Sequence, residues 1–332
     1  MKGILQKYNI QAPRYTSYPP ATEFKEDFQE SEAIRLIEKS NTELPERISL
    51  YFHFPYCPQT CHFCGCNSYL SKSKEEADEY VSALLKEVNG LLDKLDLNRP
   101  VTQIHWGGGT PNSMDYSLMD EVMTQVLNRV KLSDKAEVAM ECNPAYLKPE
   151  NIAQLKRMGF NRLSLGIQDF DPAVLKAVNR EPSAMDLTDL MGLIRANDFK
   201  GVNFDFIYGL PLQTTDGFLR SLEKAVALQP DRLVTFSYAH VPWVKAEQKK
   251  LDGLVFPDPN QKLEMLLGGM NTLTSSGYQM IGMDHYAQPT DPLGEASLQG
   301  RLHRNFQGYC TRETTGQVYA FGASSISQLQ KA

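Results

Sequence analysis

Short runs of apolar residues alternate with longer stretches of helical period along most of the chain. The clearest helical stretch begins where Ser73 forms a capping box with Glu76, and it carries one apolar stripe: Val81, Leu84, Leu85, Val88, Leu91, Leu92 and Leu95. The apolar runs predict strands, each followed directly or after a loop by a helix-like stretch: ISLYFHF (centred on 49–54), VTQIHW (101–106), AEVAMEC (136–142), NRLSLGI (161–167), GVNFDFI (201–207) and DRLVTFSY (231–238).

Six such strand–helix units, with no hairpin turns between them, predict a parallel sheet connected by crossover helices. The expected fold class is therefore α/β, an open and partial (β/α)6 version of the TIM-like barrel. The Pro- and Tyr-rich start of the chain predicts an extended N-terminal arm, residues 1–35, and one core domain with a C-terminal strand extension would occupy residues 36–332. Because ligands bind at the carboxyl ends of parallel strands, the loops at those ends are expected to form the site.

Composition excludes several classes of partner. Of the 332 residues, 42% are hydrophobic and 22% are charged, which is ordinary for a globular protein with a buried core. The net charge of −6 gives no basis for binding to nucleic acid or to a membrane surface. Neither a long apolar run nor a secretory leader is evident, so we expect a cytoplasmic protein, and we take it to be a monomer. Clustered thiols in that reducing compartment indicate something other than disulfides.

Four of the six cysteines lie within ten positions: Cys57, Cys61, Cys64 and Cys66. Zinc sites normally use two separated pairs and a catalytic thiol needs one cysteine beside a histidine, so an iron–sulfur cluster is favoured over both. The spacing C-x3-C-x2-C is typical of the radical S-adenosylmethionine (radical SAM) superfamily, in which three thiolates leave one iron of a 4Fe-4S cluster open for the nucleotide. We therefore assign Cys57, Cys61 and Cys64 as metal ligands. A fourth thiolate from Cys66 would close the open iron, and its role stays unassigned.

A second motif, WGGGTP (106–111), follows the next predicted strand. Glycines let the backbone approach a ligand closely and leave N–H groups unobstructed. The motif resembles the superfamily element that holds the methionine amino group, although Thr110 stands here where that element has a Glu. Glu141, at the end of the third predicted strand, is a candidate for the ribose or the amino group; its alternative is a solvated strand end.

Further motifs narrow the resemblance. They are QKYNIQAPRYTSYP, YFHFPYCPQTCHFCGCN, HWGGGTP, FNRLSLGIQDF, VNRE, DFIYGLPLQT, SYAHVP, GYQMIGMDHYA and LHRNFQGY. Together, in order from about residue 6 to about residue 328, they resemble the family of oxygen-independent coproporphyrinogen III dehydrogenase, the anaerobic enzyme of haem biosynthesis. The resemblance implies a radical SAM core domain and two S-adenosylmethionine molecules beside the cluster.

Carried over by motif, the family's cofactor contacts fall on eleven residues. The first S-adenosylmethionine would contact Tyr51, Gly108, Glu141 and Ile326. The second would contact Phe63, Gly109, Thr110, Gln168, Arg180, Asp205 and Ala239. Because the cofactor performs the chemistry, no residue is assigned as a certain catalyst; His53 and Glu141 are expected to support it. The residue types alone leave structural hydrogen bonding open as an alternative for four positions: His53, Gln168, Arg180 and Asp205.

The implied reaction oxidatively decarboxylates coproporphyrinogen III to protoporphyrinogen IX, converting two propionates to vinyl groups through a 5′-deoxyadenosyl radical. It implies an electron donor such as flavodoxin or ferredoxin, and Arg14 and Arg304 are candidates for holding substrate carboxylates. A helical C-terminal domain that helps cover the substrate follows in the family, whereas this chain stops at Ala332, so a truncated, inactive relative is one alternative. A haem-binding chaperone and a haem-degrading methyltransferase of the same superfamily are the others.

Overall fold

The computed structural model describes residues 7, 23–25, 27–71, 73–305 and 308–331, so most of the predicted N-terminal arm lies outside the described residues. Within these described residues the main sheet has nine strands, in the order β13 (Gln317–Phe321), β1 (Ile48–Phe54), β4 (Pro100–Gly108), β5 (Lys131–Cys142), β6 (Arg162–Gln168), β7 (Gly201–Tyr208), β8 (Arg232–Ser237), β10 (His285–Ala287) and β9 (Gln279–Gly282). Two small ribbons pair β2 (Tyr56–Cys57) with β3 (Tyr69–Leu70), and β11 (Leu302–Asn305) with β12 (Gly308–Thr311).

Helices connect these strands. The α-helices are α2 (Glu30–Ser40), α3 (Lys74–Leu92), α4 (Tyr116–Leu127), α5 (Pro149–Arg157), α6 (Pro172–Ala177), α7 (Leu187–Ala196), α8 (Thr215–Ala227), α9 (Pro259–Ser275) and α10 (Pro292–Leu298). Short 3₁₀ turns are η2 (Pro111–Ser113), η3 (Pro144–Tyr146) and η4 (Ala246–Leu251). The predicted N-cap of α3 is present, because the Ser73 side chain accepts a hydrogen bond from the Glu76 N–H at 3.2 Å.

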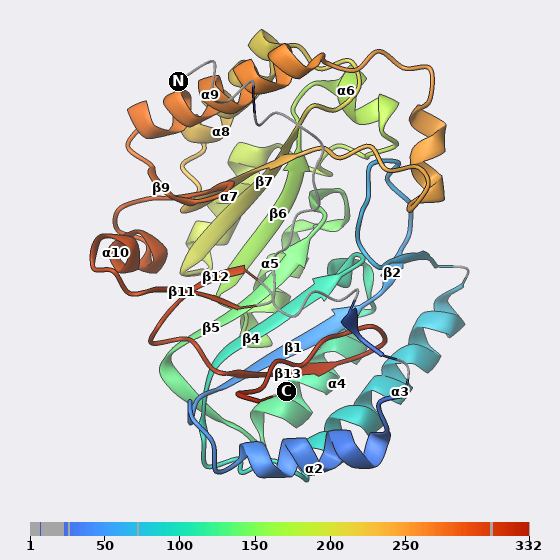
Figure 1. Ribbon diagram of the computed structural model, residues 1–332, viewed down its shortest axis with the longest axis vertical. Coiled ribbons are helices and arrows are strands. Elements are labelled where there is room, and N and C mark those ends of the chain that lie inside the picture. The colour runs from blue at the N-terminus through green and yellow to red at the C-terminus, as the bar shows by residue number, and fades with distance from the viewer. Residues whose placement is uncertain (1–6, 8–22, 26, 72, 306–307, 332) are drawn as a thin grey trace.

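The six predicted strands, β1 and β4 to β8, are adjacent and parallel, which confirms the open (β/α)6 arrangement. Beyond these six strands, the sheet no longer follows the strand–helix repeat. β10 and β9 add antiparallel strands beside β8, while β13 returns to the opposite edge and pairs parallel with β1 (Figure 1). The last part of the predicted arm, residues 1–35, overlaps α2, which begins at Glu30 and packs Ile37 against the core.

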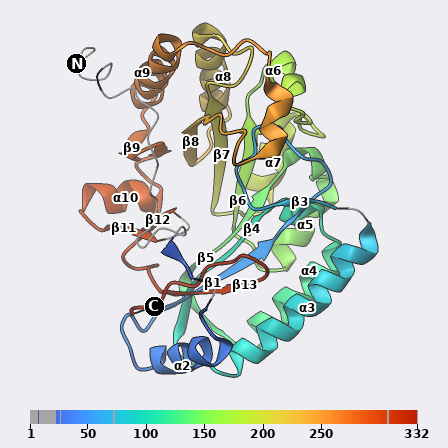
Figure 2. The same cartoon turned by 45° about the vertical axis from the view of Figure 1, so that its right-hand side comes forward.

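Successive residues of the central strands point to opposite faces of the sheet, and the two faces differ in chemistry. One face is apolar and fully buried: Ile104, Trp106, Val138, Met140, Leu163, Leu165, Val202, Phe204, Phe206 and Leu233. The other face is polar and lines a cavity: Gln103, His105, Glu137, Glu141, Arg162, Ser164, Asn203, Asp205 and Arg232. In Figure 2, α3, α4 and α5 lie on one side of the sheet, and α10, β11 and β12 lie on the other. The sheet therefore separates a helix-covered core from a polar interior.

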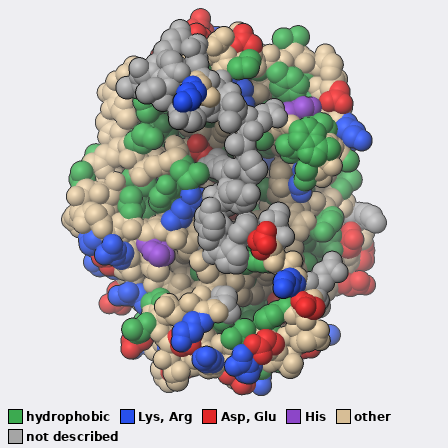
Figure 3. All heavy atoms as spheres, viewed as in Figure 1, with side chains coloured by type: hydrophobic (Ala, Val, Ile, Leu, Met, Phe, Trp, Pro, Cys, Tyr) green, Lys and Arg blue, Asp and Glu red, His purple; other side chains and the backbone are tan. Residues whose placement is uncertain are grey.

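The distribution of charged side chains on the surface is consistent with the modest net charge of −6. On the face shown in Figure 3, basic and acidic side chains are interspersed, most densely at its lower end, around α2. Among the described residues, none of the helices combines the length and the apolar character needed to cross a bilayer.

Candidate functional site

A cavity of about 800 Å³ lies where the carboxyl ends of the parallel strands meet. Twelve of the predicted site residues line it: Cys57, Cys61, Phe63, Cys64, Gly108, Gly109, Thr110, Glu141, Gln168, Arg180, Asp205 and Ala239. Three others do not line it: Tyr51, His53 and Ile326. Residues from six different strands and the segments that follow them are thus brought to one place, as expected for a ligand site on this architecture.

The cysteine loop, residues 55–71, is held in place by backbone and amide hydrogen bonds. Its own strands β2 and β3 pair in parallel. The His62 N–H donates to the Val178 carbonyl at 2.9 Å, which joins the loop to the end of α6. Asn179 holds it twice more, because its Nδ2 donates to the Thr60 carbonyl at 2.8 Å and its own carbonyl accepts from Gln59 at 3.0 Å. The loop's shape is therefore set by residues more than a hundred positions away.

Each of the three predicted ligand sulfurs has a hydrogen-bonding partner. Thr110 Oγ1 donates to Cys57 Sγ at 3.2 Å, and Arg180 Nη1 donates to Cys61 Sγ at 3.7 Å. Cys64 Sγ and Ser68 Oγ lie 3.9 Å apart. Within the described residues, no three His, Cys, Asp or Glu side chains converge closely enough to surround a single metal ion. Three thiols spread over one cavity wall, each with a donor nearby, fit a larger iron–sulfur cluster, whose sulfurs are commonly stabilised by hydrogen bonds.

Cys66 lines the same cavity and pairs with Cys64. The hydrogen bond from the Cys66 thiol lowers the pKa of Cys64 to about 6, and the same bond raises the pKa of Cys66. Burial instead raises the pKa of Cys57 and of Cys61, with the Thr110 and Arg180 donors acting in the opposite direction. Within this loop, Cys64 is therefore the thiol whose thiolate the protein favours most.

The glycine turn after β4 packs directly on the cysteine loop. The Gly109 N–H donates to the Phe54 carbonyl at 2.7 Å, and a Cβ on Gly109 would come within 2.6 Å of the Tyr56 carbonyl oxygen. Gly108 adopts φ +114°, a region that favours glycine, and its N–H donates to Glu141 Oε2 at 3.3 Å. The turn therefore needs glycine for close approach at one position and for backbone conformation at the other.

Glu141 is not a free, solvated strand end, although its side chain is 47% exposed. Besides the Gly108 N–H, its carboxylate binds His105 Nε2 at 3.1 Å. Burial alone would lower the pKa of His105, but the hydrogen bond and the negative charge of Glu141 raise it above its usual value. The arrangement leaves a carboxylate at the cavity with two fixed protein partners and part of its surface accessible.

Tyr51 and His53 support the site from behind rather than lining it. The Tyr51 hydroxyl bonds His53 Nδ1 at 3.0 Å, and His53 Nε2 bonds the Asn67 carbonyl of the cysteine loop at 3.0 Å. Tyr51 also stacks on His105, with ring centroids 6.0 Å apart. Ile326 is half-buried in the segment that follows β13, beside β1.

Gln168, Arg180 and Asp205 converge on the cavity from two neighbouring strand–helix units. Gln168 ends β6 and Arg180 follows α6 in the same unit, whereas Asp205 lies in β7. Gln168 ends β6 with φ 69°, which is unusual for a residue with a side chain. Arg180 donates to the Gly166 carbonyl, and a Cβ on Gly166 would come within 2.8–2.9 Å of the Gln168 and Arg180 side chains. Asp205 accepts hydrogen bonds from Ser164 and Asn203, both at 2.8 Å, yet burial raises its pKa to about 6.

Several polar residues of the cavity were not predicted from the sequence: Gln103, His105, Glu137, Arg162, Ser164, Asn203 and Arg232. The signal that could have found them is the period-two alternation of polar and apolar residues in each strand. Two arginines, Arg14 and Arg304, were predicted as candidates for holding substrate carboxylates. Arg14 lies outside the described residues. Arg304, in β11, packs over the Tyr309 ring with its guanidinium 5.3 Å from the ring centroid.

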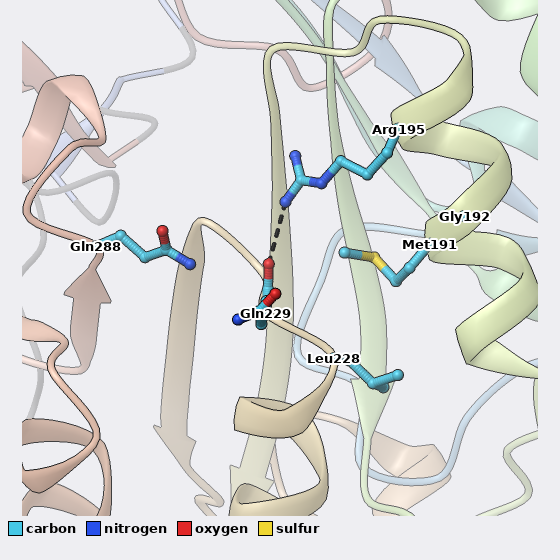
Figure 4. Close-up of a pocket in the computed structure, with 6 residues that line it drawn as sticks. All are labelled: Met191, Gly192, Arg195, Leu228, Gln229 and Gln288. Atoms are coloured by element: carbon cyan, nitrogen blue, oxygen red, sulfur yellow. Dashed lines mark hydrogen bonds between the residues drawn. The ribbon is translucent and has the colours of Figure 1, made fainter.

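A second, smaller cavity of about 320 Å³ lies between α7, the turn before β8 and the segment after β10 (Figure 4). Its most polar lining residue, Arg195, donates to the Gln229 carbonyl at 3.1 Å and pairs with Asp231 at 2.9 Å. This cavity lies near the amino ends of β7 and β8. The contacts of Arg195 therefore join α7 to the turn before β8.

Comparison with known proteins agrees with this geometry. A model of the radical SAM superfamily matches residues 51–225. An oxygen-independent coproporphyrinogen III oxidase of Synechocystis sp. is 43% identical over 98% of this chain and 70% of that protein. One from Escherichia coli is 41% identical with the same coverage. A solved structure of coproporphyrinogen III oxidase from Escherichia coli, described as a radical SAM enzyme, has a TM-score of 0.89 and 40% identity over 98% of this chain and 73% of that one. The chain therefore belongs to the radical SAM superfamily and, within it, to the family of oxygen-independent coproporphyrinogen III oxidases.

Proposed function

We propose that this protein catalyses the oxygen-independent oxidative decarboxylation of coproporphyrinogen III to protoporphyrinogen IX, with residues 36–332 as its radical SAM core domain. The observation that carries the proposal is the cavity wall formed by Cys57, Cys61 and Cys64, in a chain 43% identical to such an oxidase over 98% of its length. The dehydrogenase named in the sequence resemblance and the oxidase named in the comparisons are two names for the enzyme of this reaction.

The three thiolates would hold the 4Fe-4S cluster, with Thr110 and Arg180 donating to two of the sulfurs. When bound, the cluster and S-adenosylmethionine supply the one-electron chemistry that removes a hydrogen from a propionate side chain, which protein side chains cannot do. The part of this chain is to orient the reactants and exclude water from them. A cavity enclosed by six strand ends is suited to that task.

Two S-adenosylmethionine molecules are proposed. For the first, Glu141 and Gly108 present a carboxylate and a glycine backbone at the cavity, while Tyr51 and Ile326 belong to its proposed surroundings. The second would use seven residues that all line the cavity: Phe63, Gly109, Thr110, Gln168, Arg180, Asp205 and Ala239. Asp205 suits a ribose hydroxyl, and Arg180 suits a carboxylate.

We further propose a small cytoplasmic electron carrier, a flavodoxin or ferredoxin, as the reductant and a monomer as the working form. Arg304 is proposed to hold a substrate carboxylate, because the Tyr309 ring on the paired strand β12 positions its guanidinium group.

Anaerobic reconstitution tests the proposal. The reconstituted protein, supplied with coproporphyrinogen III, S-adenosylmethionine and a reductant, should form protoporphyrinogen IX. Cys57→Ala, Cys61→Ala and Cys64→Ala should each lose most of the bound iron and sulfide, whereas Cys66→Ala should keep the cluster. Stable haem binding without any decarboxylation, or a ring-opened tetrapyrrole product, would show that the assigned reaction is wrong. Equal cluster loss in Cys66→Ala would show that the ligand assignment is wrong.

The second cofactor site needs separate variants. Arg180→Ala and Asp205→Ala should retain the cluster and nearly the wild-type melting temperature, yet abolish turnover of the tetrapyrrole. Cleavage of the first S-adenosylmethionine, measured as 5′-deoxyadenosine release, should survive in part. Normal vinyl formation in both variants would contradict the assignment.

A further inference from the structure

The segment that follows β8 rests on the cysteine loop through two side chains. Gln248, which is 1% exposed, donates from Nε2 to the Phe63 carbonyl at 3.2 Å and accepts from the Val241 N–H at 2.6 Å. Lys245 donates from Nζ to the Cys66 carbonyl at 2.8 Å. Figures 1 and 2 show this orange segment, which includes η4, beside the blue loop after β1. The two donors therefore hold carbonyl groups on either side of Cys64.

The two donors differ in charge. Gln248 is neutral, whereas Lys245 places an ammonium group against a loop whose residues 56–71 include no Asp, Glu, Lys or Arg.

Three other charged groups near the loop have partners of their own. Glu247 pairs with Lys250 at 2.5 Å, Arg180 faces Cys61, and Glu141 binds His105. Lys245 is thus a cation committed to the backbone of the metal-binding loop.

We propose that Lys245 is a positioning residue that raises the reduction potential of the cluster held by Cys57, Cys61 and Cys64. The inference rests on the proposed function, since it requires that cluster. Reduction adds one electron from a one-electron donor, breaks no bond and makes the cluster more negative. A neighbouring ammonium group stabilises the more negative state, and iron–sulfur potentials are set in part by such charges and hydrogen bonds. A unit charge acting over roughly 10 Å through an effective dielectric constant of about 20 changes an equilibrium by about tenfold.

The test is a redox titration of the anaerobically reconstituted holoprotein with dithionite, followed by the electron paramagnetic resonance signal of the reduced cluster. Lys245→Gln keeps a hydrogen-bond donor but removes the charge, and Lys245→Arg keeps both. Lys249→Gln removes a lysine exposed on η4 and serves as the matched control. Iron content and melting temperature are measured on every sample.

Lys245→Gln should lower the ratio of reduced to oxidised cluster about tenfold at a fixed potential, a shift of about 59 mV for a one-electron couple. Lys245→Arg and Lys249→Gln should titrate like the wild type. A full cluster with an unchanged potential in Lys245→Gln would overturn the inference alone. An equal shift in Lys249→Gln would also overturn it, because the effect would then be one of surface charge. Absence of a cluster from the wild type would overturn it together with the proposed function.

Discussion

Asp205 shows how burial and hydrogen bonding act in opposite directions on one carboxyl group. Its side chain lies inside the barrel, where burial disfavours the charged form. The hydrogen bonds from Ser164 and Asn203 favour the charged form but do not compensate, and the pKa rises from 3.8 to about 6. The native state therefore binds this proton more tightly than the unfolded chain does.

The sign of the pH dependence follows from that difference. Because the native pKa of Asp205 is the higher one, stability falls as pH rises from the unfolded value of 3.8 through about 6. Between pH 5 and pH 7 this group should cost about 1 kcal/mol of unfolding free energy. Asp205→Asn should lack that part of the pH dependence in urea denaturation curves. Parallel pH profiles for the variant and the wild type would contradict the raised pKa.

Asp169 illustrates a motif residue that serves the fold rather than a ligand. It follows Gln168 in the GIQDF motif, yet it is 2% exposed and its carboxylate is fully engaged. It accepts from two backbone N–H groups of its own loop, from Ser221 and from Gln213. The motif thus combines a cavity residue with the anchor that fixes its loop.

At the scale of elements, the site depends on the contact between the turn after β4 and the loop after β1. A side chain on Gly109 would meet backbone atoms of Pro55 and Tyr56 at 2.6–2.8 Å, and backbone cannot move aside as a flexible side chain can. The turn also supplies Thr110, which donates to Cys57. Close packing here therefore fixes a proposed metal ligand.

Gly109→Ala should separate the turn from the cysteine loop and reduce the iron bound per chain to less than half. Gly90→Ala is the matched control, because Gly90 lies within α3 and has open space where a Cβ would be. Removing a helix-interior glycine should stabilise the control by about 0.5–1 kcal/mol. Iron analysis and thermal melting of both variants check this. Full iron content in Gly109→Ala would mean that the two segments tolerate separation.

At the scale of the whole molecule, a buried ring of four charges ties the C-terminal extension to the barrel. Asp291, the N-cap of α10 and 1% exposed in its side chain, pairs with Arg162 and Arg232 at 2.9 Å. Both arginines also pair with Glu137, at 3.0 and 3.1 Å. Four charges of alternating sign, from β5, β6, β8 and the N-cap of α10, therefore join three strands of the barrel to the C-terminal extension.

Asp291→Asn keeps the size of the side chain but leaves two buried arginines short of a carboxylate. Breaking a buried ion pair costs about 3–5 kcal/mol, and we expect a loss of about 3 kcal/mol in unfolding free energy. Glu313→Gln is the control, since the Arg301–Glu313 pair is 39% and 45% exposed and should contribute less than about 1 kcal/mol. Urea denaturation and the rate of proteolysis within residues 279–321 measure both. Equal stability of the two variants would show that the ring does not hold the extension.

The sequence by itself determined the features that short-range patterns encode. Apolar runs at strand period, separated by helical stretches, gave six parallel strands in the right order, because each element must bury one face. The spacing of Cys57, Cys61 and Cys64 indicated the cluster, because that spacing is typical of the radical SAM superfamily. Motifs then placed twelve proposed site residues that do line one cavity.

Only the tertiary structure decided which distant groups meet. Glu141 binds His105 from the neighbouring strand, Asp291 reaches Arg162 across 129 positions, and Lys245 reaches Cys66 across 179. It also decided that Tyr51 supports the site without lining it, and that β13 returns to pair with β1. Such contacts depend on sheet register and on how the C-terminal extension folds back, and no local period or spacing records either one.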